Sequence, residues 1–271
     1  MNKEEKVLTE TVVLKLGLDK VDVITSDMIE GYTRIGYSAF VGCSQLASID
    51  IPNSVTSIGY SAFAGCFHLA SINIPNSVTI IEGSAFEDCT SLASINIPNS
   101  VTNIGSCAFA WCSSLTTITI PNSVAGIGES TFWYCSSLTS VTIPNSVMYI
   151  RLNAFYGCNK LREVIIGDKT YETQEVVNGK CKAYKAFNAD LTCRDFQYEE
   201  GETYEIEGKP ELCVRGFHTC LRLTDVFNYY CGVIGKIIVV HEVELESVSE
   251  KVNVDDSKVV AKKITIGKRI L

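Results

Sequence analysis

The feature that most constrains this chain of 271 residues is a segment that recurs with a fixed period of 23 residues. The pentapeptide Ile-Pro-Asn-Ser-Val occurs five times, and each copy starts 23 residues after the one before it. The copies begin at Ile51, Ile74, Ile97, Ile120 and Ile143. A constant period of this size is typical of repeat proteins in which each copy forms one structural unit.

Six consecutive units of 23 residues cover residues 28–166, and apolar residues keep fixed places in them while the other residues vary. One unit of this length cannot enclose its own apolar side chains, so each must pack against its neighbours. The phenylalanine column is Phe40, Phe63, Phe86, Phe109, Phe132 and Phe155, and the leucine column is Leu46, Leu69, Leu92, Leu115, Leu138 and Leu161. The sequence therefore predicts one continuous solenoid over residues 28–166, with residues 1–27 as an N-terminal cap.

Each unit contains the alternating pattern Leu-x-x-Ile-x-Ile, as in Leu69, Ile72 and Ile74. Alternation with a period of two predicts a strand, and Pro75 ends it because proline has no N–H for the ladder. Pro-Asn-Ser is typical of a turn, and residues 59–66 are too few for a regular helix, so we expect a loop or a brief 3₁₀ turn there. The prediction is therefore one strand per coil.

The motifs Leu-x-x-Ile-x-Ile-Pro, Ser-x-Ala-Phe and Gly-Cys-x-x-Leu resemble the BspA-like (Treponema-type) leucine-rich repeat family over residues 28–166, about half of the chain. The resemblance implies a curved, right-handed solenoid with its strands on the concave side. It also implies adhesion or protein binding, often at cell surfaces. This sequence departs from the family in having no recognisable leader.

Six of the 12 cysteines share one register of the repeat. They are Cys43, Cys66, Cys89, Cys112, Cys135 and Cys158. Because the column lies among Leu, Ile and Phe, we interpret it as buried, reduced thiols that act as small hydrophobic residues. A metal ladder or a chain of disulfides is the alternative.

Polar side chains flank the inward residues of each predicted strand and should point outward on the concave face. The candidate binding residues of this kind are Asn73, Asn96, Thr119 and Thr142. Residues 28–166 contain only four Lys or Arg and seven Asp or Glu, so this surface offers hydrogen bonds rather than electrostatic steering.

Three large aromatic residues, Trp111, Trp133 and Tyr134, replace small residues at the Gly65 position and at the position before it. The period places them on one rim of neighbouring coils, where aromatic area commonly anchors a partner. Alternatively, they simply cover the edge of the coil.

Composition excludes several classes of partner. The formal net charge of −8 disfavours nucleic acid and anionic membranes, whose binding depends on Lys and Arg. No run approaches the roughly 18 apolar residues that span a bilayer, so we expect no membrane insertion. The N-terminal region lacks a signal peptide pattern, which favours a cytoplasmic location; the protein would be at the surface or secreted if a leader had been removed.

Charge density rises after Gly167, where residues 167–271 hold fifteen Lys or Arg and eighteen Asp or Glu. We interpret this part as a separate small α+β domain, which makes the whole chain α+β. The expected strands are residues 181–187, 211–214 and 236–245, and the expected helix is residues 225–230. Residues 180–270 resemble a small uncharacterised domain of phage and gut-bacterial proteins, and this resemblance supplies no known activity.

Cys213, His218 and Cys220 are the most chemically suggestive group in this domain, with Cys193 and Cys231 as further candidates. The spacing C-x₄-H-x-C is not a zinc knuckle, so buried thiols beside a histidine are favoured over a metal site or a Cys-His nucleophile.

His241 shares its face of a strand with Val239 and Val243. The alternation predicts a core histidine, with Glu242 and Glu244 on the opposite, solvated face.

These observations together predict a protein-binding scaffold that uses the repeat surface, is not an enzyme and needs no cofactor. Two alternatives remain. The C-terminal domain is an enzyme or effector that the repeat targets, for which a pocket lined by Tyr204, His218 and Tyr229 would argue, or the protein is a surface adhesin. The pattern predicts neither the identity of the partner nor the oligomeric state.

Overall fold

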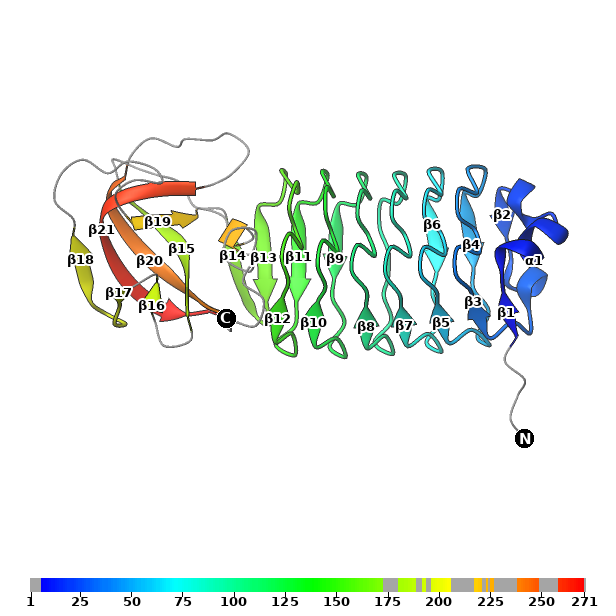
Figure 1. Cartoon of the computed structure of the whole chain (residues 1–271), viewed down its shortest axis with the longest axis horizontal. Coiled ribbons are helices and arrows are strands. Elements are labelled where there is room, and N and C mark those ends of the chain that lie inside the picture. The colour runs from blue at the N-terminus through cyan, green and yellow to red at the C-terminus, as the bar shows by residue number, and fades with distance from the viewer. Residues whose placement is uncertain are drawn as a thin grey trace. The chain divides into compact units, whose positions relative to one another are not determined.

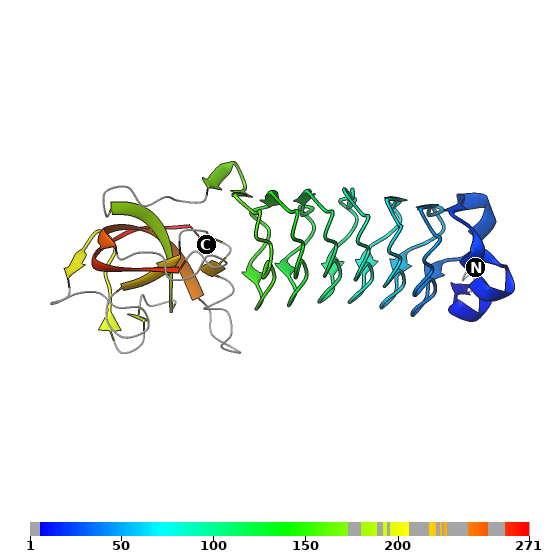
Figure 2. The ribbon, with the colours of Figure 1, turned by 90° about the horizontal axis from the view of Figure 1, so that it is seen from above.

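The structure is a computed structural model that describes residues 6–172, 180–188, 192–193, 196–205, 217–220, 223, 225–226, 238–248 and 258–270. The chain divides into two compact units, residues 1–170 and 171–271, and each is described by itself. In the first unit the coils of the repeat are stacked side by side (Figures 1 and 2).

The predicted strands form one strip of parallel strands, interrupted at residues 94–96, which we call the strand face. Neighbouring strands pair in the register of the repeat, for example Ser48 with Ser71 and Ser140 with Glu163. The strands are β4 (Ser48–Asp50), β6 (Ser71–Asn73), β9 (Thr117–Thr119), β11 (Ser140–Ile143) and β13 (Glu163–Ile166), and β14 (Lys169–Glu172) follows β13 in the same sheet. The predicted solenoid is thus confirmed.

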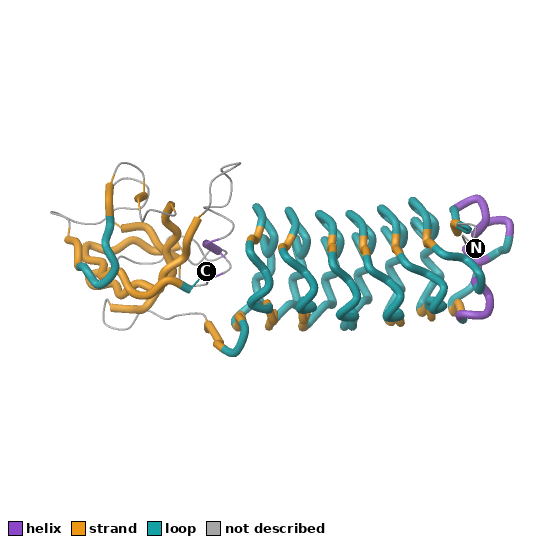
Figure 3. The backbone as a smooth tube through the Cα atoms, turned by 90° about the horizontal axis from the view of Figure 1, so that it is seen from below, coloured by secondary structure: helices purple, strands orange, loops and turns teal. Residues whose placement is uncertain are grey.

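A second strip of short parallel strands shows that the prediction of one strand per coil is wrong. Each coil turns after Pro-Asn-Ser and extends again for two residues, so most of the coil remains loop between short strands (Figure 3). These strands are β3 (Arg34–Ile35), β5 (Ser57–Ile58), β7 (Ile80–Ile81), β8 (Asn103–Ile104), β10 (Gly126–Ile127) and β12 (Tyr149–Ile150). Two residues are too few to show a period-two alternation, and for that reason the pattern gave no strand signal.

The segment before the repeat continues both strips by one strand. β1 (Val7–Leu8) pairs with β3, and β2 (Val23–Ile24) pairs with β4. Between them lie α1 (Glu10–Lys15) and the 3₁₀ turns η1 (Leu18–Lys20) and η2 (Ser26–Ile29). The Thr9 side chain accepts a hydrogen bond from the backbone N–H of Val12 and so caps α1. This segment supplies buried Val13, Leu18 and Ile29 to the end of the core.

The core of the solenoid consists of the predicted columns. All six phenylalanines of the column are at most 2% exposed, and neighbouring rings are stacked with centroids 5.2–5.6 Å apart. The leucine column is equally buried. Within the strand face, Ile49 and Ile118 are buried, whereas Ile72 and Ile95 are only half-buried.

The six cysteines that share one register are buried and free, as predicted. Five of them also make a contact that the sequence did not suggest, because each thiol donates a hydrogen bond to the carbonyl of the phenylalanine 26 residues earlier. Cys66 reaches Phe40 at 3.1 Å and Cys89 reaches Phe63 at 3.3 Å, and Cys112, Cys135 and Cys158 repeat the pattern. The thiols are therefore hydrogen-bonded links between coils as well as apolar filling.

The second unit is built mainly of antiparallel strands. β15 (Lys180–Asn188), β19 (Phe217–Cys220), β20 (Ile238–Val248) and β21 (Lys258–Arg269) pair in a closed ring, with β18 (Thr203–Glu205) on β21. A short hairpin joins β16 (Thr192–Cys193) and β17 (Phe196–Gln197). The ring encloses a core that includes Val243, Leu245 and Ile264.

Two of the strands predicted in this unit are confirmed, since residues 181–187 lie in β15 and most of residues 236–245 lie in β20. Residues 211–214 and 227–230 are outside the described part of the chain, while Leu223, Asp225 and Val226 are helical. The long strand β21 was not predicted, because Lys262 and Lys263 interrupt its apolar pattern.

Candidate functional site

The predicted aromatic residues occupy an unusual backbone position. Two places in each coil have a left-handed conformation. One holds Ser38, Ser61, Ser84, Cys107, Ser130 and Asn153 in successive coils, and the other holds Gly42, Gly65, Asp88, Trp111, Tyr134 and Gly157. Trp111 has a φ of 63° and Tyr134 a φ of 55°. This conformation costs a residue with a side chain about 1–2 kcal/mol, a cost that glycine avoids. Two large aromatic residues therefore stand where the backbone favours glycine.

The structure brings all three predicted aromatic residues together and adds a fourth, Tyr156. The rings of Trp111 and Tyr134 are stacked, with centroids 4.4 Å apart and planes 7° apart. Trp133 lies edge-on to both rings, and Tyr156 lies edge-on to Tyr134 at 5.7 Å. Tyr156 follows Trp133 by one period, so the column itself was a signal that could have identified it. We call these four residues the aromatic cluster.

The aromatic cluster is partly open to solvent. Trp111 is 38% exposed and Tyr156 is 45% exposed, whereas Trp133 and Tyr134 are half-buried. Tyr134 lies so close over Gly157 that a Cβ atom there would stand 2.8 Å from the ring. The glycine of the next coil thus leaves room for the ring of Tyr134.

Three of the four polar candidates of the strand face, Asn73, Asn96 and Thr119, are exposed, and Thr142 is half-buried. Asn73 donates a hydrogen bond to Asp50 at 2.7 Å. Asn96, Thr119 and Thr142 line a groove with a volume of about 690 Å³, which Asn73 does not line. The structure therefore unites three of the four residues in one concave site, which we call the strand-face groove.

The strand-face groove lies where the sheet is interrupted. Residues 94–96 occupy the strand position between β6 and β9, but they form no strand and share no backbone hydrogen bond with the other described residues. Half-buried Ile72 and Ile95 lie at the same place. The interruption was not predictable from Ser94-Ile95-Asn96, because the preceding unit has the same residue types, Ser71-Ile72-Asn73, and forms β6.

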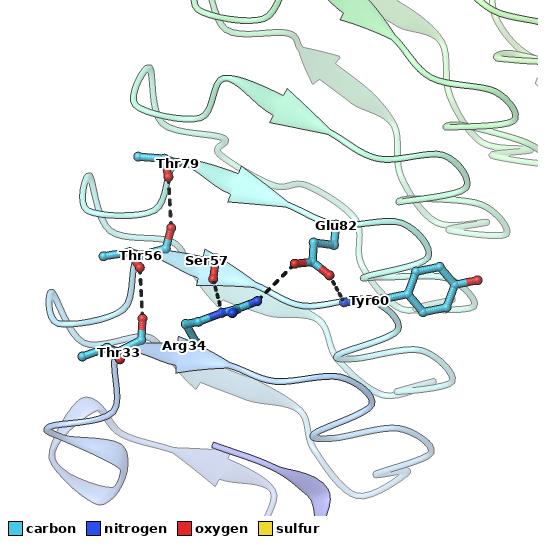
Figure 4. A network of polar contacts seen from close by, with 7 residues as sticks. All are labelled: Thr33, Arg34, Thr56, Ser57, Tyr60, Thr79 and Glu82. Carbon is cyan, nitrogen blue, oxygen red and sulfur yellow. Dashed lines mark hydrogen bonds and ion pairs between the residues drawn. The ribbon is translucent and has the colours of Figure 1, made fainter. Parts of the chain in front are cut away.

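A different polar network joins the second strip of strands near the N-terminus (Figure 4). Arg34 donates to the Ser57 hydroxyl at 3.0 Å and forms an ion pair with Glu82 at 3.3 Å, two coils away. The other oxygen of Glu82 accepts the backbone N–H of Tyr60 at 2.9 Å. This network links three coils, so its role is structural.

Threonine hydroxyls beside this network form a ladder along the stack. Thr56 donates to the carbonyl of Thr33 at 3.2 Å, and Thr79 donates to that of Thr56 at 3.3 Å (Figure 4). A serine ladder repeats the arrangement, with Ser77 donating to Val55 and Ser100 to Val78, both at 2.7 Å. These columns stabilise the stack and are not available to a ligand.

The chemical candidates of the second unit give no assembled site in the described part of the chain. Cys213, Cys231 and Tyr229 lie outside it, as do the side chains of His218 and Cys193, while Cys220 is buried. Tyr204 is described, and its hydroxyl accepts the backbone N–H of Glu199 at 2.8 Å. Among the described residues, no group of three His, Cys, Asp or Glu side chains could hold a metal ion.

His241 is a core residue, which confirms the prediction. It is 2% exposed, and its Nδ1 is hydrogen-bonded to the carbonyl of Gly267 at 2.8 Å. Glu242 and Glu244 on the opposite face are more exposed. Within the described residues, no helix is both long and apolar enough to cross a bilayer.

Comparison with known proteins supports the repeat assignment. A family described as BspA type Leucine rich repeat region (6 copies) matches residues 20–91 and 56–185. A second family, described as Domain of unknown function (DUF7666), matches residues 181–271. No curated protein matches the chain.

Two solved structures resemble the chain over its repeat half. The T. pallidum leucine-rich repeat protein is 36% identical with a TM-score of 0.52, and the match covers 55% of this chain and 71% of that one. A leucine-rich repeat protein from Bacteroides ovatus is also 36% identical, with a TM-score of 0.51, and the match covers 56% of this chain and 39% of that one.

Proposed function

We propose that this chain, which belongs to the BspA-type leucine-rich repeat family, is a scaffold that binds a protein partner through its repeat surface. The observation that carries the proposal is the aromatic cluster. Stacked coils provide a long, regular surface on which side chains of adjacent units act together. The cluster is the place on this surface with the most contiguous aromatic area.

Energetics favours binding over simple packing as the role of the aromatic cluster. Trp111 and Tyr134 hold a backbone conformation that costs about 1–2 kcal/mol each, although the coils with Gly42 and Gly65 show that the fold accepts glycine there. Small or polar residues hold the other left-handed places of the repeat, such as Ser61, Ser84 and Asp88, so large aromatic side chains are not what this backbone requires. Stacking offsets part of the cost, and contact with a partner would use the exposed edges.

The chemistry of the aromatic cluster fits a protein surface. Trp and Tyr are the residues that most often dominate the binding energy of protein interfaces, because each combines a large apolar body with one polar group. The cluster has no charge of its own, and nearby residues supply few charges. A partner with an apolar patch and a polar rim would be complementary to it.

The proposal assigns no reaction to either unit. The aromatic cluster contains no nucleophile and no acid-base pair, so the chemistry it offers is contact and hydrogen bonding. If the purified 171–271 fragment were found to turn over a substrate, the enzymatic alternative would replace this part of the proposal.

A comparison of three full-length baits tests the proposal. The wild-type chain should capture a protein that the double variant Trp111→Ala/Trp133→Ala does not capture. Tyr37→Ala is the matched control, because Tyr37 is also an exposed aromatic residue of the repeat, stacked on Tyr60 at 5.8 Å. Equal capture by all three baits would show that the aromatic cluster is not the binding site.

A further inference from the structure

The strand-face groove differs chemically from the aromatic cluster. None of its fourteen lining residues is charged. Its polar groups are amides and hydroxyls that three successive coils contribute in turn, Asn96 and Asn99, then Thr119 and Asn122, then Thr142 and Asn145. A ligand with phosphate or carboxylate groups would find no cation here, which favours a neutral ligand rich in hydrogen-bonding groups.

Most polar side chains of the groove are available to a ligand; Ser146 is the exception, because its hydroxyl donates to the carbonyl of Val124 at 3.1 Å. Elsewhere in the repeat, hydroxyls such as those of Ser77 and Thr79 are engaged with the carbonyls of the preceding coil. The side chains of Asn96, Asn122 and Thr119, by contrast, make no hydrogen bond with the described residues of the protein. The backbone of residues 94–96 adds further donors and acceptors, because the sheet is interrupted there.

The floor of the groove is apolar. Ile120 and Pro121 are buried beneath the polar groups, and Ile95 is half-buried beside them. A binding site of about 690 Å³ with an apolar floor and a few convergent polar groups falls in the range of ligand pockets. A sugar ring has matching surfaces, since its C–H faces are apolar and its hydroxyls lie around its edge.

The spacing of equivalent side chains along the groove favours some neutral polymers over others as ligands. Equivalent phenylalanine rings of neighbouring coils lie 5.4–5.6 Å apart in this part of the stack, so a ligand lying along it meets the same side-chain types at about that interval. An extended peptide advances about 3.3 Å per residue, so its residues would not align with successive coils. A β-1,4-linked hexose chain advances by nearly the coil spacing per sugar, and it is straight.

We propose that the strand-face groove binds a straight, neutral oligosaccharide of β-1,4-linked hexoses, laid along the stack of coils. Each sugar would face one coil, with its hydroxyls at the asparagine and threonine side chains and a C–H face over the isoleucine and proline floor. The groove ends at Gly167, where the Ile-Pro sequence of Ile143 and Pro144 is replaced by Ile-Gly. The proposal is independent of the protein partner proposed above.

Calorimetric titration of the full chain with cellohexaose, mannohexaose and chitohexaose tests the proposal, and α-linked maltohexaose serves as a ligand of the wrong geometry. At least one β-1,4-linked hexamer should bind about tenfold or more tightly than maltohexaose. Failure of all three to bind at millimolar concentration, or equal binding of maltohexaose, would overturn it.

Variants place the site. Asn122→Trp should block the groove and weaken the bound hexamer about tenfold or more, because Asn122 is exposed in the middle of the lining. Asn53→Trp is the matched control, since Asn53 holds the equivalent exposed position three coils earlier, outside the groove. Its affinity should equal that of the wild type, and equal losses in both variants would refute the assignment.

Two further variants guard against misfolding and against confusion with the other site. The triple variant Asn96→Ala/Asn122→Ala/Asn145→Ala removes the amides without adding bulk and should also lose affinity. The double variant Trp111→Ala/Trp133→Ala should keep it, so the two proposed sites fail or succeed separately. Unchanged hexamer binding by the triple variant would contradict the proposal.

Discussion

The indole of Trp111 and the phenol of Tyr134 lie face to face with ring centroids 4.4 Å apart, although both residues occupy a position where three other coils have glycine. Stacking thus favours an aromatic residue at this position, whereas the left-handed backbone favours glycine. Loss of an aromatic pair costs about 0.5–1.5 kcal/mol, which is close to the cost of the left-handed conformation.

Trp111→Gly and Trp111→Ala separate these two effects. Both variants lose the stack, but only glycine also relieves the backbone, so we expect Trp111→Gly to be more stable than Trp111→Ala by about 1 kcal/mol. In the interior of a helix or strand the alanine variant is usually the more stable one, so the expected order is the reverse of the usual order. Urea unfolding of the two variants measures the difference, and a more stable alanine variant would contradict the account.

Gly157→Ala should destabilise the protein more than Gly42→Ala does. Both glycines have a left-handed φ, but a Cβ at Gly157 would stand 2.8 Å from the ring of Tyr134, whereas at Gly42 nothing lies within 4 Å. The difference between their unfolding free energies reports the clash alone. Tryptophan fluorescence should change in Gly157→Ala only, because Tyr134 must move relative to Trp111.

Phe86→Ala should cost about 3–5 kcal/mol of unfolding free energy, as large truncations in close-packed cores do. Phe86 is fully buried and is stacked between Phe63 and Phe109 at 5.4 Å on both sides. Denaturant unfolding followed by circular dichroism measures the loss. An unchanged transition would argue against the phenylalanine column as the centre of the stack.

Stability should fall at alkaline pH. Burial raises the pKa of the Cys43 thiol to about 11 and that of the Cys66 thiol to about 12, from an ordinary value of 9.0. The pKa of each thiol is higher in the folded than in the unfolded protein, so the buried, neutral thiols contribute to stability. This contribution is fully present below about pH 9 and is lost as the pH rises toward 12. The measurement is the unfolding free energy as a function of pH.

Cys66→Ser is the control for the pH dependence. Its hydroxyl can still donate to the carbonyl of Phe40 but does not ionise in this range, so the variant should lose less stability between about pH 8.5 and pH 10.5 than the wild type. Identical slopes for the two proteins would rule out Cys66 as a source of the effect.

Once a protein partner has been purified, Trp133→Ala should weaken its binding by more than about 1 kcal/mol. Binding should depend only weakly on salt, because the repeat carries few charges. A double-mutant cycle with Trp111→Ala tests whether the two residues act as one patch. Wild-type affinity in both single variants would place the site elsewhere on the repeat.

The features that could be predicted from the sequence are those that follow directly from the period of 23 residues. Residues in one column are neighbours in space, which was enough to predict the phenylalanine stack, the buried cysteines and the meeting of Trp111 with Tyr134. The same reasoning could have identified Tyr156, which follows Trp133 by one period.

Features that depend on backbone detail were not predictable. The two-residue strands are shorter than any periodic pattern, and the interruption at residues 94–96 falls in a unit whose residue types match those of its neighbour. The thiol hydrogen bonds require the position of a carbonyl 26 residues earlier. In the second unit no period exists, so β21, with its paired lysines, was missed.

The bond from each thiol to the preceding coil has a consequence for how such a chain can evolve. Cys89 needs only the carbonyl of Phe63, and Cys112 needs only that of Phe86, so each of the last five coils carries the means of joining the coil before it. A duplication of 23 codons therefore inserts a coil that already fits on both sides. A gain or loss of any other length would shift the thiols away from their carbonyls, so the gene can lengthen or shorten in whole units while the protein remains folded.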